Sequence, residues 1–210
     1  MTTSTPKFRQ ALSIFAFLFL AIVLGGCLSR PSMKIQTFAF SAPLTAATNS
    51  APVGHVLGIR ELQIAPPFDE RSLVYRTGDF SYERDPYAEF LGSPADELTA
   101  AISGILSAAG CFGAVVQMGS AAKPDILAEI RVSQLYGDIR KPDFPGAVLA
   151  IQVLFVKAAN GLSGDVILHR SYSRRIPVKS ATAGEFMKGW NEALNEILAE
   201  VASDFRSQEP

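Results

Sequence analysis

The chain has 210 residues, with 19 Lys and Arg against 20 Asp and Glu, so its formal net charge at pH 7 is −1. Proteins that bind nucleic acid through its phosphates need a clustered basic face, and this charge balance gives no indication of one. Only two cysteines and two histidines occur, and their spacing is not that of metal ligands. The length suits one domain after a short leader.

The first 26 residues have the layout of a secretory signal peptide. Lys7 and Arg9 form a positive n-region, and a predominantly apolar run follows from Ala11 to Leu24. A helix over this run would span about 21 Å, which is short of the ~30 Å hydrocarbon core of a bilayer. An uncleaved membrane anchor is therefore the weaker alternative.

The run Leu24-Gly25-Gly26-Cys27 resembles the bacterial lipobox. In that motif the cysteine is diacylated and the signal peptide is cut before it, so the resemblance makes Cys27 the lipidation site, with palmitate-like acyl chains as anchor. Two or three chains hold a protein stably in a membrane, whereas one binds reversibly. Leu28 is not the Asp that retains many lipoproteins in the inner membrane, which favours the outer membrane. Residues 28–33 form a tether of at most ~20 Å, so the domain stays close to its membrane.

Apolar alternation, helical spacing and turn residues predict the elements of the mature chain. In chain order we expect strands over 34–40, 55–64, 73–76 and 80–83, a helix over 94–109, strands over 112–117, 125–139, 147–157 and 165–176, and a final helix from 182 to 205. Ser93 and Pro94 mark the start of the first helix, and Gly110 marks its end. A loop is expected over 41–53.

These elements predict an α+β fold with a single domain. Two amphipathic helices are expected to pack on a mixed, mainly antiparallel sheet. The expected boundaries are a signal peptide over 1–26, a lipidated tether over 27–33, the folded domain over 34–206 and a tail over 207–210.

Five aromatic residues lie in a stretch of turns and short strands and are candidate partner-binding residues: Phe68, Tyr75, Tyr82, Tyr87 and Phe90. Exposed aromatic side chains mark contacts with protein or lipid, and the alternative is that most of the five belong to the core. Three arginines pose a similar choice between docking an acidic partner and forming a polar strand face: Arg170, Arg174 and Arg175.

The sequence carries no motif that predicts catalysis. It has no nucleophile elbow, phosphate-binding loop or paired-cysteine motif, and His55 and His169 each stand alone on an expected strand. The segment Asp69-Glu70-Arg71 is interpreted as a solvated turn, and Cys111 as a small buried hydrophobe. We therefore expect a protein that is not an enzyme and has no cofactor and no metal.

Several features combine along the mature chain. They are the lipobox, the strand over 34–40, the segment from Ile59 to Tyr75 with its Pro-Pro and Phe-Asp-Glu-Arg turn, and the segment from Tyr87 to Pro94 followed by a helix and Gly110-Cys111-Phe112. This combination resembles the ABC-type transport auxiliary lipoprotein family of the PqiC/YmbA type over nearly the whole mature chain. Many members carry a tryptophan near the position of Phe90, and this chain does not.

The resemblance implies a periplasm-facing lipoprotein of the outer membrane that works with an ABC transporter and an MCE-domain protein to move lipids between membranes. The chain would be a docking subunit held by acyl chains on Cys27, with a homo-oligomer left open and no nucleic-acid partner. The alternative is a freestanding envelope lipoprotein that assists outer-membrane assembly or binds peptidoglycan. A hydrolase is a third hypothesis, which would need a pocket with converging titratable groups.

Overall fold

The computed structural model describes residues 34–41, 54–117, 119–159 and 162–208. The predicted signal peptide, Cys27 and most of the loop expected over 41–53 lie outside these ranges. Residues from Ile35 onward form one compact unit. The strands and helices of this unit are β1 (Gln36–Phe38), β2 (Val56–Ile64), β3 (Ser72–Arg76), β4 (Tyr82–Phe90), α2 (Pro94–Ala108), β5 (Ala114–Gln117), β6 (Ile126–Asp138), β7 (Gly146–Ala159), β8 (Leu162–Pro177) and α3 (Ala183–Gln208).

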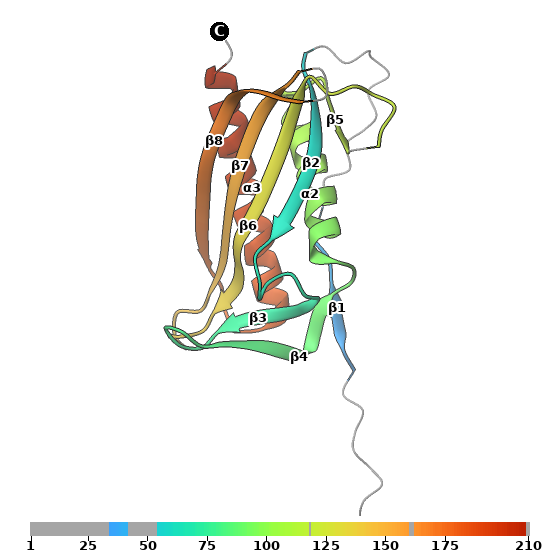
Figure 1. The fold of residues 1–210 in the computed structure, drawn as a ribbon. Helices are drawn as coiled ribbons and strands as arrows, with labels where there is room; N and C mark the ends of the chain where they lie inside the picture. The colour runs from blue at the N-terminus through green and yellow to red at the C-terminus, as the bar shows by residue number, and fades with distance from the viewer. Residues whose placement is uncertain (1–33, 42–53, 118, 160–161, 209–210) are drawn as a thin grey trace, which may run out of the picture. The chain divides into compact units, whose positions relative to one another are not determined.

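The sheet branches at β6 (Figure 1). Along one side, β6 pairs antiparallel with β7, which pairs antiparallel with β8. Along its other side, the first half of β6 pairs in parallel with β2, and its last residues pair in parallel with β3. The β2 branch ends in β5, and the β3 branch continues through β4 to β1. The sheet is therefore mixed, and its two longest ladders are antiparallel.

Alternation along β6 explains why the sheet has one apolar face. Ile126, Ala128, Ile130 and Val132 are buried, whereas Arg131 between them is exposed. Successive side chains of a strand point to opposite faces, so the four apolar side chains share the face that meets the helices. The strand predicted over 125–139 from apolar alternation is confirmed.

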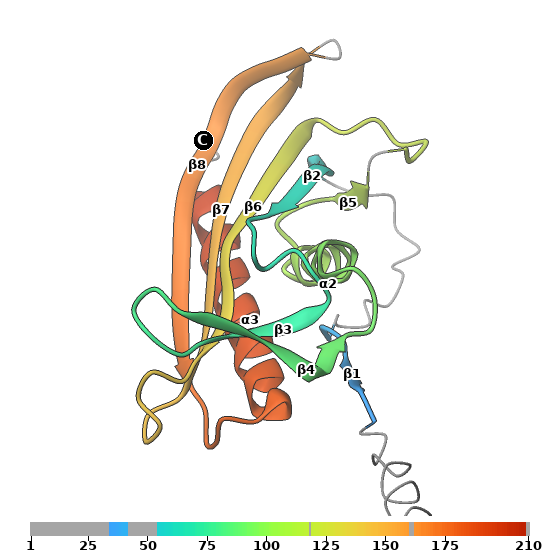
Figure 2. The same ribbon diagram turned by 60° about the horizontal axis from the view of Figure 1, so that its bottom comes forward.

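Both helices pack on that apolar face, as Figure 2 shows for α3 behind β6 to β8 and for α2 beside them. Pro94 occupies the start of α2, where its missing N–H is no loss. Gly110, just beyond the helix, has a φ of +66°, which is the left-handed conformation that glycine adopts freely. α3 presents a continuous buried stripe that includes Phe186, Trp190 and Phe205. The predicted α+β fold with two packed amphipathic helices is confirmed.

Two strands differ from the sequence prediction. β4 spans Tyr82–Phe90, much longer than the expected 80–83, and β1 has three residues. The second half of β4 pairs in parallel with β1, and a register shift separates this half from the part that forms the hairpin with β3. The extra length of β4 depends on its pairing with β1, which lies some 50 positions earlier in the chain, as the pairing of Phe38 with Phe90 shows. Local alternation does not contain that information.

Candidate functional site

The predicted lipidation site, Cys27, lies outside the described residues, so its role stays a prediction. The five candidate aromatic residues are all described, and they do not form one surface. Phe90 is only 2% exposed and belongs to the core between sheet and helices. Its ring stacks on Phe40, with centroids 5.7 Å apart, and lies 6.2 Å from the ring of Trp190. Phe90 therefore belongs to the core, as the alternative interpretation of the five aromatic residues expected.

Phe68 and Tyr82 lie on the opposite face of the sheet. Together with Tyr136 they form a three-ring cluster with centroids 5.6–5.9 Å apart. The guanidinium of Arg76 lies over both tyrosine rings, 5.8 and 5.9 Å from their centroids, a geometry that is attractive through the ring quadrupoles. Phe68 is buried within this cluster, and Tyr82 remains 40% exposed. The cluster covers the end of the outer sheet face near β3 and β4.

Tyr75 and Tyr87 have different surroundings again. The ring of Tyr75 packs on Phe186, and its hydroxyl donates a 2.7 Å hydrogen bond to Asp85. Burial raises the pKa of Tyr75 well above its usual value, and the neighbouring Asp85 carboxylate raises it further. Tyr87 is 45% exposed. The prediction that this set binds a partner remains a prediction, and it now depends on the two exposed tyrosines, Tyr82 and Tyr87.

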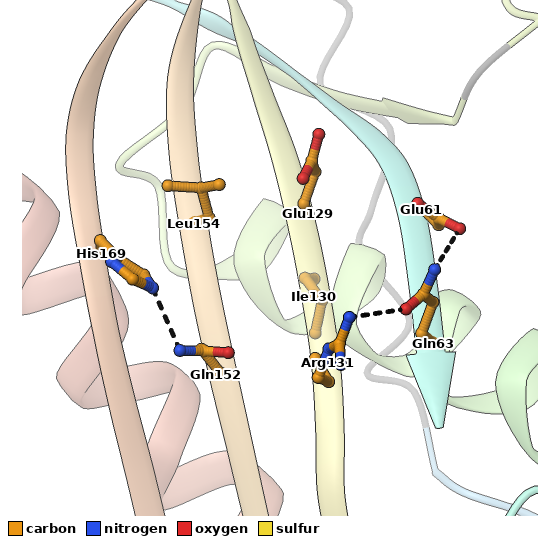
Figure 3. Close-up of a pocket in the computed structure, with 8 residues that line it drawn as sticks. All are labelled: Glu61, Gln63, Glu129, Ile130, Arg131, Gln152, Leu154 and His169. Atoms are coloured by element: carbon orange, nitrogen blue, oxygen red, sulfur yellow. Dashed lines mark hydrogen bonds between the residues drawn. The ribbon is translucent and has the colours of Figure 1, made fainter. Parts of the chain in front are cut away.

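The remainder of the outer sheet face, called the open sheet face below, carries a row of exposed and half-buried polar side chains (Figure 3). A shallow cavity of about 230 Å³ lies across β2, β6, β7 and β8. In it Arg131 donates a 3.0 Å hydrogen bond to the amide oxygen of Gln63, whose amide nitrogen donates to Glu61 at 2.6 Å. Gln152 and His169 share a 3.1 Å hydrogen bond on the other side. These groups offer donors and acceptors in a row on four adjacent strands.

Sequence reasoning missed this surface as a unit. Glu129 and Arg131 belong to the strand predicted over 125–139, but the partners of these residues are far away in the chain. Arg60 pairs with Glu129 at 3.3 Å, and Arg131 bonds to Gln63, in both cases across the parallel pairing of β2 and β6. Only the register of that pairing brings the four side chains together.

A second polar cluster lies at the end of the sheet where β6 passes into β7. Asp138 is 5% exposed and accepts two hydrogen bonds from the guanidinium of Arg140, at 3.0 and 2.9 Å. Arg175 lies 3.6 Å from the same carboxylate. These contacts, above all the hydrogen bonds from Arg140, lower the pKa of Asp138 to about 2. The carboxylate is therefore a charged structural centre that holds two arginines beside a cavity of about 480 Å³.

The three arginines of the last strand all contact carboxylates of their own chain. Arg170 pairs with Asp204 at 2.6 Å, and Arg174 pairs with Glu196 and Glu200 of α3 at 3.0 and 2.5 Å. Arg175 belongs to the Asp138 cluster described above. These contacts correspond to the polar strand face that was weighed against docking of an acidic partner.

The described residues show no arrangement typical of a metal or catalytic centre. Among them, no three His, Cys, Asp or Glu side chains converge in a way that could hold a metal ion. Asp69 and Glu70 lie on the surface as expected, and Glu70 pairs with Arg84 at 2.7 Å. No helix within the described ranges has the length and apolar character needed to cross a bilayer. The expectation that the protein is not an enzyme is left as a prediction.

Comparison with known proteins identifies the family. The sequence profile of the ABC-type transport auxiliary lipoprotein component family matches residues 37–202, and the chain belongs to this family. The resemblance inferred from the lipobox and the scattered motifs is thereby confirmed. None of the curated proteins matches the chain in sequence.

Two solved structures share the fold. A protein from Xanthomonas campestris is 16% identical with a TM-score of 0.66, and the alignment covers 80% of this chain and 92% of that protein. A second, an uncharacterized protein, is 13% identical with a TM-score of 0.61, covering 80% of this chain and 99% of the other. At these identities the likeness establishes the fold and nothing finer.

Proposed function

We propose that this chain is a non-enzymatic lipoprotein of the outer membrane that docks the periplasmic part of an ABC and MCE-type lipid transport system. The family match over 37–202 carries the proposal, because it makes the chain an auxiliary lipoprotein of ABC-type transport. Acyl chains on Cys27 provide the anchor, and Leu28, in place of the Asp that retains many lipoproteins in the inner membrane, favours the outer membrane. The folded domain then faces the periplasm.

The open sheet face is the surface that docks the MCE-domain protein. α2 and α3 cover the other face, and the cluster around Tyr136 covers only one end of the outer face. The remainder presents the hydrogen-bonding groups of Glu61, Arg131, Gln152 and His169 across four strands. Non-obligate protein interfaces combine a polar surface of this kind with about one hydrogen bond per 100–200 Å².

The anchor is tested by Cys27→Ser, because serine cannot be acylated through a thiol. The variant is expected to be a folded protein in the soluble periplasmic fraction, with lipid transport lost when measured by outer-membrane barrier function. Cys111→Ser is the matched control, since Cys111 lies in the domain far along the chain from the lipobox, and should keep both membrane fractionation and transport. Full transport by the unlipidated variant would refute the anchoring role.

The docking face is tested by placing a photo-crosslinking amino acid at Gln152 in intact cells. Gln152 lies on the open face, and Asn195, an exposed amide residue on α3, is the matched site on the helical side. We expect a crosslink to the MCE-domain protein from position 152 and little or none from position 195. Equal crosslinking from both positions would contradict docking through the sheet face, and crosslinking from 195 alone would show that the helical side docks instead.

A further inference from the structure

The exposed apolar side chains gather at one end of the domain. Figure 1 shows β1, the β3–β4 hairpin, the β4–α2 connection and the β6–β7 loop together at the end opposite the C-terminal end of α3. Among the described residues, the large apolar side chains that are exposed on these segments are Ile35, Phe80, Tyr82, Tyr87, Leu91 and Phe144. The remaining one, Val166, lies near the start of β8 at the other end. Clustered exposed apolar groups indicate a contact surface.

Two phenylalanines protrude furthest, and the loops that carry them are held in place. Phe80, in the β3–β4 turn, is 97% exposed, and Phe144, in the β6–β7 loop, is 69% exposed. Arg140 in the second loop pairs with Asp79 in the first at 3.1 Å. Arg175 donates a 2.6 Å hydrogen bond to the carbonyl oxygen of Phe144. The two rings therefore project into solvent from a framework that its own ion pairs hold together.

The charges around these rings cancel. Over the β3–β4 hairpin (residues 76–85) and the β6–β7 loop (residues 138–143), with Arg175 beside them, the charged groups are balanced: the basic ones are Arg76, Arg84, Arg140, Lys141 and Arg175, and the acidic ones are Asp79, Glu83, Asp85, Asp138 and Asp143. An electrostatic attraction to anionic lipid requires an excess of Lys and Arg near the surface, and this end has none. The apolar rings of Phe80 and Phe144 are therefore the feature of this end that would bind a partner.

The position of the domain's first residues identifies that partner. The tether from Cys27 ends at residue 33, directly before Lys34, Ile35 and β1, and β1 belongs to the same end as the two loops (Figure 1). Six tether residues reach ~20 Å when extended. The surface of the membrane that holds the anchor therefore lies within reach of this end, and it is the one apolar phase that the lipoprotein always has beside it.

We propose that Phe80 and Phe144 insert into the interfacial region of the membrane that carries the acyl anchor, as a second point of attachment that fixes the orientation of the domain. The inference rests on the lipid anchor of the proposed function. A weak interaction is sufficient, because the tether keeps the rings at a high effective concentration beside the bilayer. Aromatic side chains of interfacial elements occupy the boundary between headgroups and acyl chains in this way.

The test uses the full, acylated protein in phosphatidylcholine vesicles with brominated acyl chains, which quench tryptophan at short range. Three variants carry a tryptophan at an exposed apolar position: Phe80→Trp, Phe144→Trp and the control Val166→Trp. The buried Trp190 gives the same background in each. We expect the added emission of the first two to fall by roughly half or more, because interfacial side chains lie ~5–10 Å within the boundary region. The Val166→Trp emission should not change.

Equal quenching at positions 80, 144 and 166, or none at any of them in vesicle-bound protein, would overturn the proposal. Quenching that appears only when phosphatidylglycerol is added would also overturn it, because the attachment would then depend on charge. Failure of the proposed anchor has a different signature, since the wild-type protein would not float with the vesicles at all. Circular dichroism of the variants checks that the substitutions at the loop tips leave the fold intact.

Discussion

At the scale of single residues, Asp138 is the most consequential polar group of the domain. It is the one buried charged residue among those described, and it holds Arg140 and Arg175 at the end of the sheet. Through Arg140 it also orders the β3–β4 turn, because Arg140 reaches Asp79. Removing one partner of such a pair leaves the other with an unmatched charge, which costs more than the pair contributes.

The lowered pKa of Asp138 makes this contribution depend on pH. Its pKa in the folded protein is about 2 against an ordinary value of 3.8, so the ionised form favours folding. The stabilisation, about 2 kcal/mol by linkage, is fully present above the unfolded pKa near 4 and is lost as the pH falls towards 2. Asp138→Asn should lower the free energy of unfolding by about this amount at neutral pH, with the difference from wild type shrinking in acid.

Chemical denaturation at a series of pH values measures this difference. Asp79→Asn is the matched control, because Asp79 also accepts a hydrogen bond from Arg140 but its side chain is 79% exposed. Exposed ion pairs contribute only ~0–1 kcal/mol, so this variant should be close to wild type. A difference between wild type and Asp138→Asn that stays constant from pH 6 to pH 2 would contradict the role of the ionised carboxylate.

At the scale of elements, the packing of α3 on the sheet requires the helix backbone at Gly189 to lie close to β7. A Cβ atom added at Gly189 would lie 2.6 Å from Cβ of Ala147 in β7 and 3.0 Å from a methyl of Val178. The obstructing Cβ of Ala147 is fixed to the strand backbone, so the helix would have to move. The small residues at this crossing let α3 bring Trp190 and Phe186 fully into the core.

Gly189→Ala should therefore destabilise the protein by roughly 1–3 kcal/mol, as overpacking of a core does, although alanine favours helix formation. Gly184→Ala in the first turn of the same helix is the control, since its added Cβ would meet nothing closer than 4.0 Å. That variant should be neutral or slightly more stable. Urea denaturation of both proteins checks the expectation, and equal effects would show that α3 adjusts its position freely.

The elements also show how far sequence reasoning extends. The bounds of α2 follow from Ser93, Pro94 and Gly110, and the β6–β7–β8 meander follows from alternation and turns, since these signals are local. The second half of β4, the parallel pairing of β2 with β6 and the polar cavity are set by register between distant strands. The burial of Phe68 and Phe90 escapes local reading for the same reason, because the rings that cover them come from Tyr136 and Trp190.

At the scale of the whole molecule, β6 connects every part of the described domain. It pairs with β2, β3 and β7, and a single apolar core extends from the β1 end to the C-terminal turn of α3. No branch of the sheet has a core of its own. The domain should therefore unfold as one cooperative unit.

Urea unfolding of the Cys27→Ser protein tests this cooperativity with two probes. Trp190 is the only tryptophan of the chain and reports on the core, whereas far-ultraviolet circular dichroism reports on both helices and all strands. The two transitions are expected to coincide in midpoint and slope. A fluorescence transition that clearly precedes the loss of secondary structure would show that the β3–β4–β1 branch melts separately.

β1 has a mechanical consequence for a tethered protein. Any pull on the proposed lipid anchor would reach the fold through this strand, which has three residues and, within the described residues, pairs with β4 alone. The antiparallel ladders of β6 with β7 and of β7 with β8 are several times longer. Under tension β1 would detach from β4 first. Each residue released would lengthen the tether by ~3.3–3.6 Å, while the core stays folded. Detachment of this short strand would thus let the membrane move relative to a domain docked to its partner without unfolding the rest of the sheet.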